Sequence, residues 1–199
     1  GFFDARAIGF TLLIQIFAHF GATTEAIHEL LIEPEAADSS TSRDGWGNVS
    51  SYFHVTRPHQ RLSVTSRSIV EVAPPPPDVY QGPSARAPWE IARPVGSEGA
   101  LASEFTLDLT PPEITDALRE YAAPTFTPGR PLIDVLADLT SRIYTDFTYR
   151  SGSTTVSTQV SEVLAAREGV CQDFARLAIA CLRANGLAAS YVSGYLATD

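Results

Sequence analysis

The chain has 199 residues, enough to bury one good core or one core with a small companion domain. Its 44% hydrophobic and 19% charged residues are typical of a globular protein, and its formal net charge of -9 argues against a nucleic-acid partner, whose phosphates it would repel. All 14 basic residues are arginine, so the chain has no lysine amine for Schiff-base chemistry.

The most apolar run covers residues 7–22. It falls short of the ~20 apolar residues that a membrane helix needs, and Gln15 and His19 interrupt it. A signal peptide would have a cationic start, but the charges of Asp4 and Arg6 cancel. We therefore expect no membrane span and interpret the run as a buried strand or helix, with a partner-facing surface and a targeting remnant as the alternatives.

The first third of the chain has the pattern of a β structure. Residues 34–45 are rich in turn-forming residues, and alternating apolar and polar side chains then predict strands over residues 49–56 and 62–72. A run of four prolines ends this alternation and opens a stretch rich in Pro, Gly and Ser. We therefore expect an N-terminal antiparallel β-rich domain over residues 1–73 and a Pro/Gly-rich linker over residues 74–109, with Trp89 as a candidate anchor.

Helical periodicity begins at Thr110. Thr110 and Glu113 have the spacing of a capping box, which predicts that a helix starts there. The apolar positions between Leu132 and Ile143 predict a long amphipathic helix, and residues 158–167 a shorter one. Strands followed by helices, without a βαβ repeat, predict the α+β class with residues 110–199 as the core domain.

Both cysteines fall on a predicted helix that begins at Val170, after Gly169 as its cap. Ten residues of helix separate Cys171 from Cys181 by about 15 Å of rise, too far for a disulfide, whose Cα atoms lie within ~7 Å. We therefore expect two free thiols, which suit a reducing compartment, and predict a cytoplasmic location. Cys181 lies on the apolar stripe of the helix and is predicted to be a core residue.

Cys171 lies in the first turn of this helix. The free N–H groups and the dipole at a helix start favour a thiolate, and the same N–H groups could donate to an oxyanion. Position alone leaves a reactive thiol and a buried packing residue as equal alternatives for Cys171. We interpret Arg176 and Arg183 as a solvated helix face rather than a carboxylate site, and Asp173 as a partner of Arg176 at i, i+3.

The chain has no glycine-rich phosphate loop and no Cys/His spacing of the kind that holds a metal, so we expect neither cofactor nor metal. Tyr149 is a candidate hydrogen-bond donor near the thiol, with a packing role as the alternative.

Several segments resemble bacterial transglutaminase-like proteins. Around the thiol they read GVCQDFA at residues 169–175, ACLRANGL at 180–187 and YVSGYL at 191–196. Upstream, PGRPL at 128–132, DFTY at 146–149 and VLAAR at 163–167 also resemble the family, while Gly47-Asn48 and Tyr52-Phe53 resemble its N-terminal β domain. The resemblance spans residues 44–199.

The resemblance implies a papain-like, transglutaminase-like core with a Cys-His-Asp triad and Cys171 as its nucleophile. It implies thiol-dependent hydrolysis or acyl transfer on peptide or protein carboxamides, and we favour peptide or isopeptide hydrolysis over crosslinking. The family's His and Asp follow the strand that ends at Leu196, so we expect them beyond Asp199, the core here to be incomplete and this chain alone to be inactive. The histidines present precede the matching core: His19, His28, His54 and His59.

The alternative is a non-catalytic binding or assembly module that retains the same fold. Exposed strand edges and the apolar run at residues 7–22 would then favour a homo-oligomer.

Overall fold

The computed structural model describes residues 23–43, 49–72, 78–97, 99–108 and 112–191. The chain divides into two compact units. Among the described residues, the strand unit holds residues 23–72 and the core unit holds residues 78–191. The apolar run at residues 7–22 lies outside the described residues.

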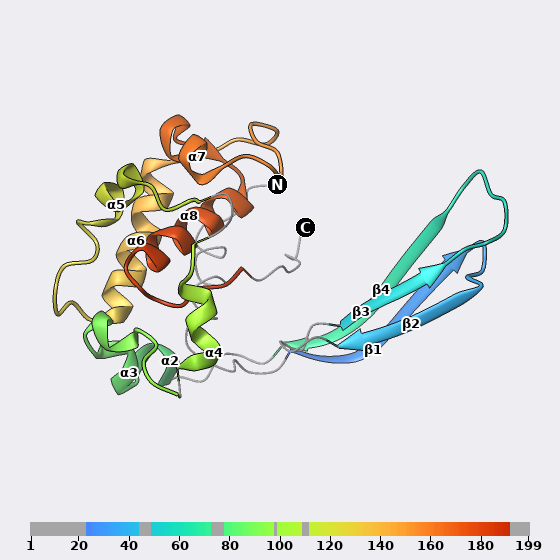
Figure 1. Ribbon diagram of the computed structural model, residues 1–199, viewed down its shortest axis with the longest axis horizontal. Helices are drawn as coiled ribbons and strands as arrows, with labels where there is room; N and C mark the ends of the chain where they lie inside the picture. Colours follow the sequence, from blue (N-terminus) through green and yellow to red (C-terminus); the bar gives the residue numbers. More distant parts are fainter. Residues whose placement is uncertain (1–22, 44–48, 73–77, 98, 109–111, 192–199) are drawn as a thin grey trace. The chain divides into compact units, whose positions relative to one another are not determined.

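The strand unit consists of two antiparallel pairs (Figure 1). One pair joins β1 (Thr23–Glu33) to β4 (Ser63–Val72), with a shift of register between Glu25 and Ile27. The other joins β2 (Asp38–Arg43) to β3 (Val49–His54). The predicted strands over 49–56 and 62–72 are confirmed. The turn-rich interpretation of residues 34–45 is wrong for β2, because ladder pairing with β3 satisfies the backbone of that polar segment.

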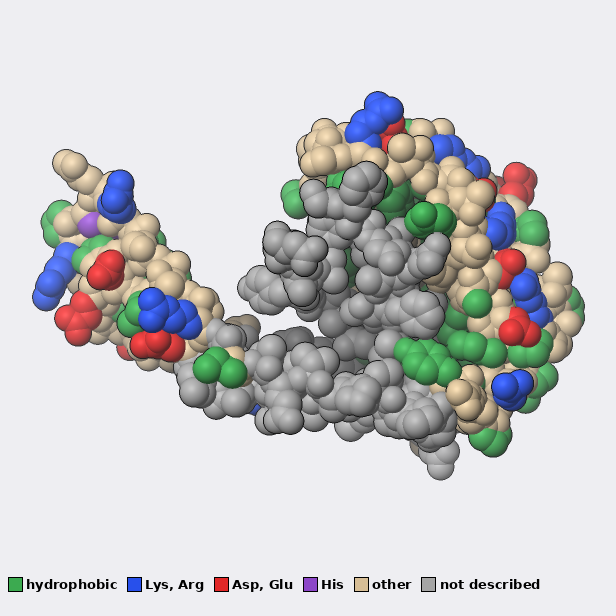
Figure 2. All heavy atoms as spheres, turned by 180° about the vertical axis from the view of Figure 1, so that it is seen from behind, with side chains coloured by type: hydrophobic (Ala, Val, Ile, Leu, Met, Phe, Trp, Pro, Cys, Tyr) green, Lys and Arg blue, Asp and Glu red, His purple; other side chains and the backbone are tan. Residues whose placement is uncertain are grey.

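Polar and apolar side chains share the surface of the strand unit. Arg67 of β4 forms an ion pair with Glu29 of β1, in which Nη1 and Oε2 lie 3.9 Å apart. Side chains of both charge signs lie together on one face of the unit (Figure 2). Large apolar side chains are also exposed, with 59% of Tyr52 and 60% of Ile69 accessible to solvent. These strands therefore present apolar surface as well as charge.

The core unit is helical over most of its described length. Its elements in chain order are α2 (Asp78–Gln81), α3 (Pro83–Arg86), η1 (Trp89–Ala92), α4 (Ala100–Ser103), η2 (Glu104–Thr106), α5 (Asp116–Ala122), α6 (Leu132–Asp146), β5 (Thr148–Tyr149), α7 (Val160–Ala166), β6 (Glu168–Gly169) and α8 (Cys171–Ala184). The predicted helices over 132–143, over 158–167 and after Gly169 are thereby confirmed.

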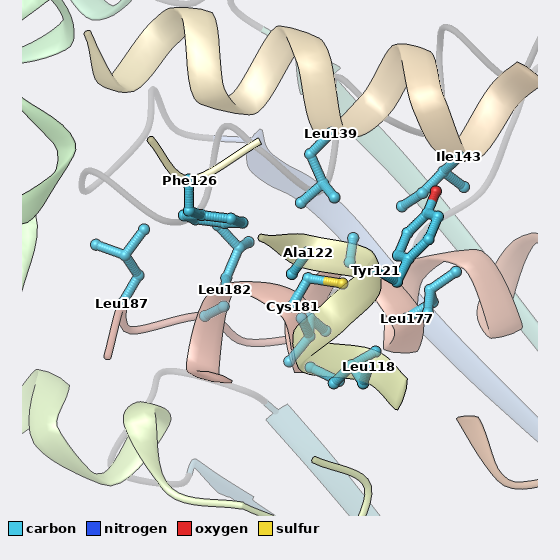
Figure 3. Close-up of a cluster of buried hydrophobic side chains, with 14 of the residues drawn as sticks. Leu118, Tyr121, Ala122, Phe126, Leu139, Ile143, Leu177, Cys181, Leu182 and Leu187 are labelled. Atoms are coloured by element: carbon cyan, nitrogen blue, oxygen red, sulfur yellow. The ribbon is translucent and has the colours of Figure 1, made fainter. Parts of the chain in front are cut away.

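Helix α8 lies in the middle of this unit, in contact with α5, α6 and α7 (Figure 1). Its interior side chains are almost all inaccessible to solvent, because apolar residues cover about half of its circumference. Figure 3 shows how α5, α6 and α8 contribute to one cluster, which includes Leu118, Leu139, Leu177 and Leu182. The core of the unit is built around α8.

The start of α5 differs from the prediction. The helix begins at Asp116, and the Oγ1 of Thr115 accepts a hydrogen bond from the backbone N–H of Leu118 at 3.2 Å. Glu113 instead lies before the helix, where its backbone N–H donates to the side chain of Asp108 at 3.0 Å. The prediction of a capping box that begins at Thr110 is therefore wrong. The side chain of Asp108 accepts from the backbone before α5, and Thr115 caps the helix. Thr110 itself lies outside the described residues.

Trp89 ties the predicted linker segment into the core unit. Only 4% of its surface is exposed, and its Nε1 donates to the backbone oxygen of Thr127 at 2.9 Å. Its ring meets that of Phe126 edge-on at 5.3 Å between centroids. The short helices around Trp89 are thus packed into the unit, beyond the single anchor that we expected.

No helix among the described residues is long and apolar enough to cross a membrane.

The core predicts a contrast between two leucines. Leu182→Ala removes a side chain with no exposed surface and leaves a cavity, so we expect it to lower the free energy of unfolding by about 2–5 kcal/mol. Leu107→Ala is the matched control: 64% of Leu107 is exposed, and we expect a change within ~0.5 kcal/mol. Urea unfolding followed by circular dichroism measures both, and equal losses would contradict the described core.

Candidate active site

Cys171 is the first residue of α8, and it is partly exposed. Val170 precedes the helix in extended conformation as its N-cap, so the helix begins one residue later than predicted. The backbone N–H groups of Cys171 and Gln172 have no acceptor within the helix, because the residues four positions earlier lie outside it. The thiol therefore sits beside two backbone donors at the positive end of a 14-residue helix.

Asp173 holds this first turn. Its side chain is 1% exposed, and its Oδ2 accepts hydrogen bonds from the backbone N–H of Val170 at 2.8 Å and from the Oγ1 of Thr154 at 2.6 Å. The predicted pairing of Asp173 with Arg176 is therefore wrong. The carboxylate points back over the helix start, where it meets an orphan N–H group and a hydroxyl of the preceding loop.

Arg176 and Arg183 are both engaged within the core unit. Arg176 forms an ion pair with Glu113 and donates to the backbone oxygen of Thr158 at 2.8 Å. Arg183 donates through Nε and Nη2 to the backbone oxygen of Ala189 at 2.9 and 2.6 Å. The interpretation of these arginines as a solvated face is wrong, because neighbouring segments cover that side of α8.

Burial also changes the ionisation of Arg183. It lowers the pKa of the guanidinium from its ordinary value, although the carboxylates of Glu113 and Asp108 act in the opposite direction. Arg183 donates through Nη1 to the backbone oxygen of Leu107 at 2.8 Å. The guanidinium thus joins the segment before α5 to the segment after α8.

Gly169 lies in the short strand β6, directly before the helix start. It is paired in parallel with Tyr149 of β5, and its oxygen accepts from the N–H of Arg150 at 2.9 Å. A Cβ at this position would lie 3.0 Å from both Cβ and Oδ2 of Asp173. Any side chain at this position would therefore press on the Asp173 carboxylate, which favours glycine here. The role of Tyr149 near the thiol stays a prediction.

Cys181 is a core residue, as predicted. It has no exposed surface and lies among Leu118, Ala122 and Leu177 (Figure 3). Burial raises the pKa of its thiol to about 12, so it is protonated at neutral pH. Both cysteines are free, which agrees with the prediction that no disulfide joins them.

The described residues of the core unit include no histidine. His28, His54 and His59 belong to the strand unit, and His19 lies outside the described residues. The described residues also hold no group of three His, Cys, Asp or Glu that could bind a metal ion. Within these residues the site consists of the thiol, the helix start and the groups that hold it.

A separate pocket opens between α5 and α7. It has a volume of about 460 Å³, and Cys171 does not line it. Its wall includes Tyr121, whose ring lies under the guanidinium groups of Arg142 at 4.4 Å and Arg167 at 5.0 Å. Burial and the neighbouring Asp146 raise the pKa of the Tyr121 hydroxyl, so this phenol stays protonated. This pocket is therefore separate from the thiol site.

Two family models match the chain. The model of the transglutaminase-like superfamily core matches residues 119–199, and that of the bacterial transglutaminase-like N-terminal region matches residues 19–71. The chain belongs to the bacterial transglutaminase-like proteins. It has the α+β class that we predicted, with N-terminal antiparallel strands followed by a helical, transglutaminase-like core region.

Mycobacterial proteins are similar to this chain. Uncharacterized proteins of Mycobacterium tuberculosis and Mycobacterium bovis are 74% identical over 172 residues, which cover 86% of this chain and 55% of those proteins. An uncharacterized protein of Mycobacterium leprae is 31% identical over 159 residues, covering 77% of this chain and 52% of its own length. The chain therefore spans about half the length of the curated relatives it matches.

One solved structure is also similar, a crystal structure described as a "Putative Cysteine Protease" from Cytophaga hutchinsonii. It is 17% identical in sequence, with a TM-score of 0.48, and the match covers 84% of this chain and 56% of that one.

The two thiols predict selective alkylation. At pH 7.5 we expect iodoacetamide to label Cys171 and to leave Cys181 unlabelled, because Cys181 is buried and its pKa is about 12. In guanidinium chloride both thiols become accessible and both should react. Mass spectrometry of proteolytic peptides measures the two sites separately. Labelling of Cys181 in the folded chain would contradict its place in the core.

Proposed function

We propose that the complete protein is a thiol-dependent amide hydrolase or acyltransferase in which Cys171 is the nucleophile. The observation that carries this proposal is the position of Cys171 as the partly exposed first residue of a long, buried helix. Membership of the transglutaminase-like superfamily supports the same chemistry. The substrate class is a peptide or protein carboxamide.

In the proposed reaction the Cys171 thiolate attacks the carbonyl carbon of the amide. The carbonyl oxygen becomes an oxyanion, for which the N–H groups of Cys171 and Gln172 are the candidate donors. The C–N bond then breaks, the nitrogen takes a proton from a general acid and leaves as an amine, and a thioester forms. Attack by water releases a carboxylic acid, whereas attack by an amine releases a new amide.

We favour hydrolysis of peptide or isopeptide bonds over crosslinking, because hydrolysis needs only water as the acceptor. The proton donor would be a histidine of the complete protein, oriented by an aspartate, as the family resemblance implies. A reducing compartment suits this chemistry, since both thiols are free. We therefore also propose a cytoplasmic location.

Substitution of the two cysteines tests the proposal in the full-length protein. Cys171→Ala should reduce amide cleavage of a peptide library by about 10³-fold or more, because the covalent step is lost. Cys181→Ala is the matched control and should retain activity, since this side chain is part of the core. Mass spectrometry detects new carboxylates, or new amides when a primary amine is added. Full activity of Cys171→Ala would exclude a covalent role for the thiol.

A non-catalytic assembly module is the second candidate, favoured by the apolar side chains that the strands expose. Ile69 on β4 is 60% exposed, and Tyr52 on β3 is 59% exposed. If this surface mediates self-association, Ile69→Ser should shift the chain toward a lower sedimentation coefficient while Cys171→Ala leaves it unchanged. A wild-type chain that sediments as a monomer at all concentrations would exclude this candidate.

A further inference from the structure

The buried carboxylate of Asp173 has two oxygens in different situations. Oδ2 accepts hydrogen bonds from Val170 and Thr154, whereas Oδ1 is buried and has no hydrogen-bond partner among the described residues. An unpaired buried carboxylate oxygen opposes folding, because its hydration is lost without replacement. Stability alone therefore does not account for an aspartate at this position.

The hydrogen bonds that Oδ2 accepts do account for an aspartate at this position. One bond fixes the peptide N–H of Val170, which directly precedes the thiol-bearing residue. A backbone hydrogen bond constrains Val170 a second time, because the N–H of Asp173 donates to the oxygen of Val170 at 3.0 Å. Val170, the residue before Cys171, is therefore held through both its N–H and its C=O group, which constrains the direction of the first N–H groups of α8.

The other bond reaches the loop between β5 and α7. Thr154 of this loop donates to Oδ2, and the backbone oxygen of Thr158, four residues on, accepts from Arg176. The loop is thus bonded to α8 at two side chains, three residues apart on the helix. Gly169 packs closely against the same side chain, since a Cβ on it would lie 3.0 Å from Asp173. Asp173 is the point at which loop, strand β6 and helix start meet.

We propose that Asp173, held by Thr154, is a positioning residue that fixes the backbone donors of the α8 start relative to the Cys171 sulfur. It acts through the backbone and the loop, and it is not itself a reacting group. The inference rests on the proposed function, because positioned donors matter only if the thiol attacks a carbonyl. Its consequence is that loss of the Thr154 bond impairs acylation of Cys171 more than alkylation.

Two reagents separate positioning from thiol reactivity in this chain. With p-nitrophenyl acetate the thiolate attacks the carbonyl, the ester C–O bond breaks, and p-nitrophenolate leaves with the electron pair, so no general acid is needed. This reaction passes through an oxyanion that the backbone donors can stabilise. With iodoacetamide the sulfur displaces iodide and no oxyanion forms. The ratio of the two rates therefore reports the donors, while the thiolate fraction cancels.

Thr154→Val is the test variant, because it removes the hydroxyl, keeps the side-chain shape and leaves the charge of Asp173 in place. We expect it to lower the ratio of acylation to alkylation at Cys171 about tenfold, less than the 10²–10³ typical for complete loss of an oxyanion donor. Thr154→Ser restores the hydroxyl and should restore the ratio. Cys171→Ala provides the background rate of ester cleavage, and absence of labelling at Cys181 verifies that each variant is folded.

Thr125→Val is the matched control. Thr125 donates to the Oδ2 of Asp138 at 2.6 Å, the same distance as the Thr154–Asp173 bond, and also accepts from Arg142 at 2.8 Å. Thr125 lies in the core unit outside the helix start that bears Cys171. The ratio of acylation to alkylation in Thr125→Val should therefore equal that of the wild type. An equal fall in Thr125→Val would show a general loss of stability and overturn the inference.

Further outcomes overturn the inference and leave the proposed function intact. These are an unchanged ratio in Thr154→Val, a parallel fall of both rates, or failure of Thr154→Ser to restore the ratio. The proposed function fails on a different result. That result is full amide cleavage by the Cys171→Ala variant of the full-length protein.

Discussion

The core unit depends on one constraint, the burial of α8 on nearly all of its sides. Apolar residues from Ala175 to Leu182 pack against α5, α6 and α7, so water reaches few of the polar groups on the same helix. A polar group withdrawn from water needs a partner inside the protein. Three side chains of α8 therefore recruit different segments: Asp173 bonds the loop at Thr154, Arg176 bonds Glu113, and Arg183 bonds Ala189 and Leu107. These polar contacts decide which segments surround the helix.

The burial of α8 also determines where the thiol is accessible. A buried helix exposes little except its ends, and Cys171 occupies the end where backbone donors are free. The residues that hold this end come from β6, from the loop before α7 and from α8 itself. A site built on a packed helix keeps its geometry more precisely than one on a mobile loop. The proposed nucleophile thus lies at a partly accessible end of the helix that organises the core unit.

Much of this arrangement was predictable from the sequence because it follows apolar periodicity. The long helix at residues 132–143, the helix after Gly169 and the burial of Cys181 all follow from a spacing of three and four residues. Polar partners were not predictable in the same way, since Glu113 is 63 residues from Arg176 and only the fold brings them together. Thr115 was not predictable as a cap, because Leu118 rather than Glu or Gln stands three residues after it. Strand β2 has six exposed residues and no apolar face to reveal it.

The separation of the two thiols along α8 bears on how the protein responds to oxidants. A sulfenic acid at Cys171 normally condenses with a nearby thiol, which protects it from irreversible oxidation. Cys181 cannot serve, because about 15 Å of helix lies between the two residues and the second sulfur is sealed in the core. Among the described residues no other thiol can reach Cys171, so a resolving thiol would have to come from another part of the complete protein, from a small molecule or from another protein. The helix that bears the proposed nucleophile therefore supplies no resolving thiol of its own.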